Sequence, residues 1–151
     1  MQSRMNHPAF VVPGAMDALQ ALGKAVSDAG SHLPLELVHL RASQINGCSV
    51  CCFLHTRALR KEGETDDRLA TVAAWREAPW FTPAEQAALA LTEALTRLAD
   101  TPDAVDDDIW ADAQDHFDET ELATLLLAIS SIQVWNRLNA ATHQVAGEWA
   151  G

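Results

Sequence analysis

The stretch that decides the fold runs from residue 46 to residue 55 and reads Asn46-Gly47-Cys48-Ser49-Val50-Cys51-Cys52-Phe53-Leu54-His55. Asn46 and Gly47 both tolerate the left-handed backbone conformation that ends helices, so they predict a stop for the helix before them. A new helix is expected to begin near Cys48 and to run to about Lys61. The chain therefore turns here, and two cysteines open the next helix.

On both sides of this stretch, apolar residues recur with the period of an α-helix. Thr82, Asp103 and Thr120 are expected to cap the last three helices, because their side chains can accept backbone hydrogen bonds. Sustained alternation is absent and the chain has no tyrosine, so strands are not expected. The sequence predicts an all-α domain. The expected helices cover residues 15–29, 34–45, 48–61, 66–77, 83–98, 104–116 and 121–144.

The length of 151 residues fits a single domain, and no linker or repeat divides it, so we expect one domain over residues 1–151. Residues 1–12 show no clear period. They are expected either to form a loose arm that frays or to pack on a partner subunit.

The net charge of −11 restricts the partners of the protein. An acidic surface repels phosphate backbones and anionic lipid headgroups, so neither nucleic-acid binding nor membrane adsorption is expected. No apolar run approaches the roughly 20 residues that span a bilayer, and the N-terminus lacks the pattern of a secretory signal. The expected location is the cytoplasm. Three cysteines within five residues cannot form a secreted disulfide framework, so they indicate redox chemistry or metal binding.

Cys48 and Cys51 are expected in the first turn of their helix, where unpaired N–H groups and the helix dipole favour an anion. The pKa of a thiol at such a position falls below about 8.5. The two residues are three apart, so their sulfurs share one face and can close a short disulfide. His55 lies on the same face and can take a thiol proton or stabilise a thiolate. Cys52 is rotated by about 100° and is expected to be a small buried apolar residue.

Glu36 and His39 are three residues apart on the preceding helix and therefore share a face. The turn at Gly47 brings that helix beside the cysteine helix. A carboxylate in this place can orient His55 or shuttle a proton through water.

The spacing of these residues resembles the motif of the alkylhydroperoxidase AhpD-like group of the carboxymuconolactone decarboxylase family. The motif is Glu36, eleven residues, Cys48-x-x-Cys51, three residues, and His55. Residues 73–82 and 135–139 also resemble a bacterial subgroup, and the likeness extends over about residues 13–145. The resemblance implies an AhpD-like helical fold and assembly into homo-oligomers, as dimers, trimers or hexamers. It also implies a thiol-dependent peroxidase that needs no bound cofactor or metal.

Carried over by motif position, Cys51 would be the thiolate that attacks the peroxide and Cys48 the resolving thiol. His55 and Glu36 would form the proton relay, with His39 next to them. The substrate would be hydrogen peroxide or a small organic hydroperoxide, and an external dithiol would reduce the pair again. The chain departs from the family pattern in having Val50 where active peroxidases often have histidine, and in the additional Cys52.

Two other hypotheses for the function remain open. Cys48, Cys51, His55 and His39 offer four suitable zinc donors, which would make the chain a redox-responsive or zinc-binding structural protein. A decarboxylase or isomerase acting on a lactone of aromatic degradation is the other reading, although such relatives typically lack the cysteine pair.

Overall fold

The computed structural model describes residues 2–148, and this part of the chain is helical and has no strand, which confirms the predicted all-α fold. Helices α2, α3 and α4 begin and end within one residue of their predicted bounds. None of the helices in the described part is long and apolar enough to cross a membrane. The helices are α1 (Pro8–Val11), α2 (Ala15–Ala29), α3 (Leu35–Asn46), α4 (Ser49–Lys61), α5 (Asp66–Thr71), the 3-10 helix η1 (Val72–Glu77), α6 (Pro83–Thr96), α7 (Asp107–His116) and α8 (Glu119–Thr142).

Capping boxes begin α6 and α8. The predicted box of α6 is present, since Glu85 N donates to Thr82 Oγ1 (3.3 Å) and Thr82 N donates to the Glu85 carboxylate (2.8 Å). The prediction that Thr120 caps α8 is wrong. Asp118 accepts from Glu121 N (2.9 Å) and donates its own N–H to the Glu121 carboxylate (2.8 Å), so a reciprocal pair begins this helix two residues earlier.

The start of α7 also differs from the prediction. Asp106, and not Asp103, is the N-cap, and it accepts a hydrogen bond from Ile109 N (2.9 Å). Asp103 adopts a left-handed conformation with φ of 56°, which places it outside the helix. The prediction failed because four aspartates occupy residues 103–108, and each of them is a suitable cap.

The predicted helix over residues 66–77 is divided into α5 and η1. Ala74 has non-helical dihedral angles (φ −122°, ψ 31°), so the chain changes direction within the segment. In this conformation the buried Trp75 donates its Nε1 hydrogen to Glu93 Oε1 (3.0 Å). Glu93 also pairs with Arg41 (2.7 Å). This buried ionic cluster joins α3, η1 and α6.

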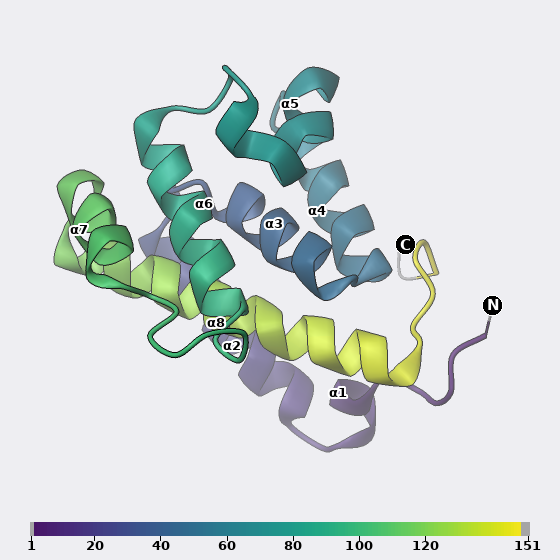
Figure 1. Ribbon diagram of the computed structural model, residues 1–151. Helices are drawn as coiled ribbons and strands as arrows, with labels where there is room; N and C mark the ends of the chain where they lie inside the picture. Colours follow the sequence, from purple (N-terminus) through teal and green to yellow (C-terminus); the bar gives the residue numbers. More distant parts are fainter. Residues whose placement is uncertain (1, 149–151) are drawn as a thin grey trace.

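The long helix α8 packs against α2, α3 and α6 (Figure 1). It contributes fully buried residues such as Leu125 and Ile129 to the main apolar core, whereas Leu127 of the same apolar run is 49% exposed. Helix α3 also packs on α4 and α6. A face of α3 and a face of α8 therefore both reach the start of α4, where the two cysteines lie.

Residues 2–12, which lack a helical period, lie along α8 of the same chain. Arg4 N donates to Thr142 O (2.8 Å), and Gln144 Nε2 donates to Met5 O (3.0 Å). The ring of His7 stacks on Trp135, with 5.5 Å between the ring centroids. These contacts place α1 next to the cysteine region.

Candidate active site

The turn between α3 and α4 positions the first cysteine. Gly47 has φ of +66°, a conformation that ends α3 and that side-chain-bearing residues rarely adopt. Cys48 N then donates to Ser43 O (3.0 Å), which closes the turn. As a result Cys48 becomes the N-cap of α4, in agreement with the predicted helix start.

The sulfur of Cys48 takes the place of a capping hydroxyl. Its Sγ accepts a hydrogen bond from Cys51 N at 3.3 Å. Both residues are free cysteines, and both are almost fully buried, with 2% of Cys48 and 3% of Cys51 exposed. The predicted dithiol therefore exists as two adjacent sulfurs at the first turn of α4.

The two thiols differ in how readily they ionise. The hydrogen bond from the Cys51 thiol, together with the one from Cys51 N, outweighs burial and lowers the pKa of Cys48 to about 6. The hydrogen bond to Cys48, burial and the charge on Cys48 raise the pKa of Cys51. The prediction that the helix start lowers both pKa values therefore holds for Cys48 but is wrong for Cys51. A second thiolate beside the first would suffer like-charge repulsion.

Asn139, on α8, contacts both sulfurs. Its Nδ2 donates to Cys51 Sγ at 3.3 Å and to Cys48 Sγ at 3.7 Å. Its Oδ1 is buried, and no donor among residues 2–148 reaches it. A buried carbonyl without a donor costs about 1–3 kcal/mol. The sequence marks Asn139 only as a polar residue in an apolar helix, because 88 residues separate it from Cys51.

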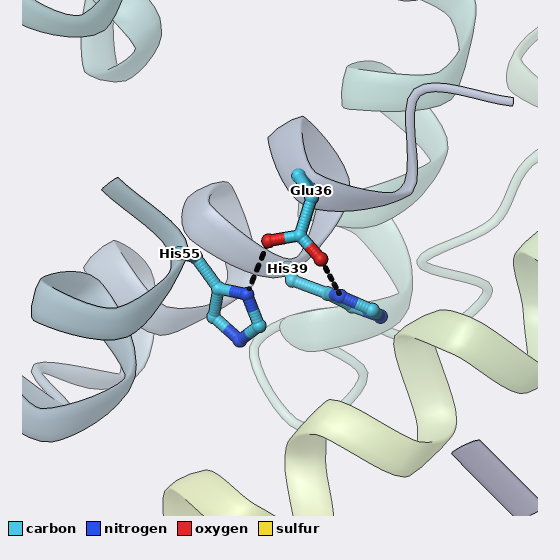
Figure 2. A group of neighbouring side chains, drawn as sticks. All are labelled: Glu36, His39 and His55. Carbon is cyan, nitrogen blue, oxygen red and sulfur yellow. Dashed lines mark hydrogen bonds and ion pairs between the residues drawn. The ribbon is translucent and has the colours of Figure 1, made fainter. Parts of the chain in front are cut away.

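Glu36 lies between the two imidazoles, with one carboxylate oxygen toward each (Figure 2). His55 Nδ1 donates to Glu36 Oε2 at 2.8 Å, and His39 Nδ1 is 3.8 Å from Glu36 Oε1. Burial favours the neutral acid, but the contacts with His39 and His55 outweigh it and lower the pKa of Glu36 to about 2. Glu36 is therefore a carboxylate at any physiological pH, as an orienting partner of His55 needs to be.

His39 is the more enclosed of the two histidines. Both of its ring nitrogens are buried, and neither has a hydrogen-bond partner among residues 2–148. Burial lowers the pKa of His39, although the interaction with Glu36 partly opposes that shift. Its ring centroid lies 4.9 Å from that of His55. Burial thus favours the neutral form of His39, whose ring packs against the Glu36–His55 pair.

The two cysteines line different cavities. Cys51 lines a cavity of about 390 Å³ together with His39 and His55. Cys48 lines another cavity of about 290 Å³, next to Ser49, Ala140 and His143. Asn139 lines both. The larger cavity has a mainly apolar wall, formed by Phe10, Met16, Val50, Leu54, Ile132 and Trp135.

Cys52 lies outside this arrangement. It is half-buried and packs against the cluster that contains Leu37 and Leu59, and burial raises the pKa of its thiol. It was expected to be a small buried apolar residue; it packs against apolar neighbours but is only partly buried. Val50, the residue between the paired cysteines, is buried and forms part of the wall of both cavities.

Glu36, His39 and His55 also form a group of potential metal ligands. One donor atom from each lies within 4.8 Å of the others. Among residues 2–148, no other group of three or more such donors lies this close together. Neither cysteine belongs to the group. The four-donor zinc site expected from Cys48, Cys51, His55 and His39 therefore does not assemble as one compact cluster.

Known proteins resemble this chain in sequence. It is 39% identical over 106 residues to the uncharacterized protein YdfG of Bacillus subtilis, a match that spans 70% of this chain and 71% of YdfG. It is 31% identical over 105 residues to the uncharacterized protein YnjA of Escherichia coli, a match that spans 70% of this chain and 56% of YnjA.

Solved structures share its fold. Protein ATU0492 of Agrobacterium tumefaciens, described as of unknown function and as a candidate antioxidant defence protein AhpD, has a TM-score of 0.87 and 32% identity over 96% of this chain and 98% of that one. The debrominase Bmp8 has a TM-score of 0.77 and 22% identity over 90% of this chain and 73% of its own, a likeness of fold alone.

The sequence model of one family agrees with these likenesses. The model of the carboxymuconolactone decarboxylase family matches residues 13–94, which include the turn at Gly47 and all of α4. The chain belongs to the carboxymuconolactone decarboxylase family and has the AhpD-like fold.

Proposed function

We propose that this protein is a thiol-dependent peroxidase that reduces hydrogen peroxide or small organic hydroperoxides with its Cys48/Cys51 pair. Membership of the family and the AhpD-like fold support an oxidoreductase. The observation that carries the finer proposal is the arrangement of the site. Two free thiols, one of low pKa, lie together at the start of α4, and Cys51 lines the same cavity as His55.

In the reduced protein the two sulfurs share one proton and one negative charge. Because Cys51 lines the cavity with His55, a hydroperoxide that enters this cavity reaches the sulfur of Cys51. When the hydroperoxide arrives, the shared proton moves from Cys51 to Cys48, and the negative charge moves from Cys48 to Cys51. Cys51 is thus the proposed attacking thiolate, although Cys48 carries the charge at rest.

The reaction then proceeds in two steps. The Cys51 thiolate donates an electron pair to the terminal peroxide oxygen, the O–O bond breaks, and the alkoxide that leaves takes a proton from the protonated His55. Cys51 is now a sulfenic acid. Cys48 then gives up the proton that it received, its thiolate attacks the Cys51 sulfur and expels hydroxide, and the hydroxide takes up this proton to become water. The sum is ROOH and two thiols giving ROH, water and one disulfide.

Glu36 supports the proposed relay through its hydrogen bond to His55 Nδ1. An anionic carboxylate orients the ring and stabilises the imidazolium that donates the proton. His39 packs on the other side of the carboxylate and restricts its position. An external dithiol completes the cycle by thiol–disulfide exchange, as the proposal requires.

Mass spectrometry and turnover measurements test this proposal. Treatment of the reduced protein with one equivalent of hydroperoxide should produce a Cys48–Cys51 disulfide, and Cys52→Ser should leave it unchanged. Cys51→Ser should abolish turnover with a dithiol, whereas Cys48→Ser should stop at the sulfenic acid. Full turnover by Cys51→Ser would show that the roles are assigned wrongly, and turnover without either cysteine would favour lactone chemistry.

A second candidate function is the binding of a divalent metal ion, favoured by the grouping of Glu36, His39 and His55. Two imidazoles and a carboxylate are common zinc ligands. Metal analysis of protein purified without added zinc distinguishes the two candidates. Stoichiometric zinc that survives dialysis, and is lost in His39→Gln, would support the metal site.

A further inference from the structure

Asn139 is the side chain on α8 that touches both reacting sulfurs, and it comes from outside the motif that defines the pair. Its Nδ2 lies 3.3 Å from Cys51 Sγ and 3.7 Å from Cys48 Sγ. His55, in contrast, hydrogen-bonds to Glu36 in the described part of the chain. Asn136, one turn earlier on α8, also interacts with both sulfurs, but its Nδ2 donates to Ser43 Oγ at 3.0 Å, so Asn139 is the amide of α8 whose Nδ2 makes direct hydrogen bonds to the sulfurs in the described part of the chain.

The oxygen of the same amide has no hydrogen-bond partner within the described residues. Asn139 is 5% exposed, and its Oδ1 is a buried acceptor that no donor within residues 2–148 reaches. Asn139 also lines the cavity that contains Cys51. An acceptor in this position is suited to a donor that arrives during the reaction, and such a donor has to come from a molecule in the cavity or from chemistry at the sulfur.

The proposed peroxidase reaction supplies such a donor at Cys51. A hydroperoxide carries its hydrogen on the terminal oxygen, and this oxygen is the one that the sulfur takes. The oxygen keeps its hydrogen when it becomes part of the sulfenic acid. One acceptor next to the Cys51 sulfur can therefore hold the same O–H group before and after the oxygen is transferred.

We propose that Asn139 is a catalytic residue whose Nδ2 stabilises the thiolate and whose Oδ1 accepts the O–H group of the hydroperoxide and then of the Cys51 sulfenic acid. This inference rests on the proposed peroxidase function. In the transfer step the sulfur gives an electron pair to the terminal oxygen, the O–O bond breaks, and the alkoxide leaves with the other pair. The hydrogen remains bonded to the transferred oxygen and donates a hydrogen bond to Asn139 Oδ1 throughout.

The first experiment titrates the reduced protein by its thiolate absorbance at 240 nm. Asn139→Leu should raise the midpoint by about 1–2 pH units, because a hydrogen bond to a charged group is lost. Thr142→Val is the matched control: it also removes a buried polar group of α8, and its hydroxyl bonds to Leu138 O and not to a sulfur. It should leave the midpoint unchanged.

A second variant keeps the titration decisive if Asn139→Leu does not fold, as judged by circular dichroism. Asn139→Asp has nearly the same shape but places a negative charge beside the sulfurs. Its midpoint should rise above the ordinary thiol value of about 8.5. A midpoint equal to that of Thr142→Val in either variant would overturn the donor role of Asn139.

The second experiment tests the acceptor role in a Cys48→Ser/Cys52→Ser background, where the sulfenic acid has no neighbouring thiol to react with. Sulfenic acid formed by one equivalent of hydroperoxide is trapped with dimedone and followed by mass spectrometry, and each rate is divided by the thiolate fraction that the absorbance at 240 nm gives for that variant at the same pH. Addition of Asn139→Leu should slow its formation about 3- to 10-fold, because one neutral hydrogen bond is lost. Addition of Thr142→Val should not.

The two proposals fail in different ways. If the background protein forms sulfenic acid and Asn139→Leu forms it equally fast, the acceptor role of Asn139 is overturned and the peroxidase proposal stands. If the background protein forms no sulfenic acid, the peroxidase proposal is overturned, and the acceptor role falls with it.

Discussion

The sulfur of Cys48 lies where two independent sources of hydrogen bonds meet, the start of α4 and the amide of Asn139. Both favour the charged form of the thiol over the neutral form, and with the Cys51 thiol they lower the pKa of Cys48 to about 6. Because the folded value is depressed, the stabilisation is fully present above the unfolded value near 9 and is lost as the pH falls through about 6.

This shift predicts how the reduced protein depends on pH. Its thiolate absorbance should rise with a midpoint near pH 6, and disulfide formation by one equivalent of hydroperoxide should slow as the pH falls below that value. Cys52→Ser should keep the midpoint, since Cys52 lies outside the pair. A midpoint near the ordinary thiol value of about 8.5 would contradict the role of Cys48 as the first thiol to ionise.

Glu36 is expected to contribute through its negative charge. Its pKa is lowered to about 2, so the carboxylate stays charged from pH 4 to pH 9. Glu36→Gln should lower turnover about 100-fold, because His55 loses its anionic partner. Glu62→Gln, which removes a carboxylate at the end of α4, should change turnover little. Equal turnover of these two variants would refute the role of Glu36.

At the scale of the helices, the turn at Gly47 decides whether Cys48 reaches its capping position. Gly47→Ala meets no atom within 4 Å, so its cost is that of the left-handed backbone, about 1–2 kcal/mol. The melting temperature should fall by about 2–8 °C, as calorimetry would detect. Gly23→Ala is the control: it also has open space but lies within α2 without a positive φ, so it should stabilise the protein. Shifts of the same sign would contradict this account.

The positions of the helices follow from local signals, but several of their ends do not. Gly30 and Gly47 end α2 and α3 where the sequence predicts, because in both cases a glycine directly follows the last helical residue. The start of α7 was mispredicted because several neighbouring aspartates are suitable caps. For α8 the sequence does carry a signal: Asp is a better N-cap than Thr, and Glu121 stands three residues after Asp118, where it completes the capping box.

The candidate site, like the helices, could be predicted from the sequence only in part. Glu36, Cys48, Cys51 and His55 lie close together in sequence, and helical spacing and one turn relate them. Asn139 contacts the sulfurs from α8, and no local pattern encodes a contact across 88 residues. The ionisation order of the two thiols depends on the direction of the hydrogen bond between them and on burial, so the sequence could not predict it.

At the scale of the whole molecule, several large apolar side chains remain exposed. Phe10 is 66% exposed, Leu127 is 49% exposed and Val134 is 38% exposed. Leu127 and Val134 are seven residues apart on α8, so they share one face of that helix. Exposed apolar patches commonly mark subunit contacts, so we propose that this face of α8 is a contact in the homo-oligomer that the family resemblance implies.

We therefore expect light scattering of the purified protein to give a multiple of the chain mass of 16.4 kDa. The double variant Leu127→Asp/Val134→Asp should shift the mass toward that of one chain, because burying two carboxylates in an interface is unfavourable. Leu98→Asp, at another exposed leucine beyond α6, is the control and should not change the mass. Wild-type protein with the mass of a single chain would exclude the assembly.

The use of the Cys48 sulfur as the N-cap of α4 has a consequence for the thermal stability of the protein. Serine is among the best natural N-caps, and sulfur is a weaker acceptor than a hydroxyl oxygen. The Cys48→Ser protein should therefore withstand heat better than the native chain, although it can no longer close the disulfide. Selection for thermal stability alone would favour serine at residue 48, so the presence of a cysteine there indicates selection for thiol reactivity.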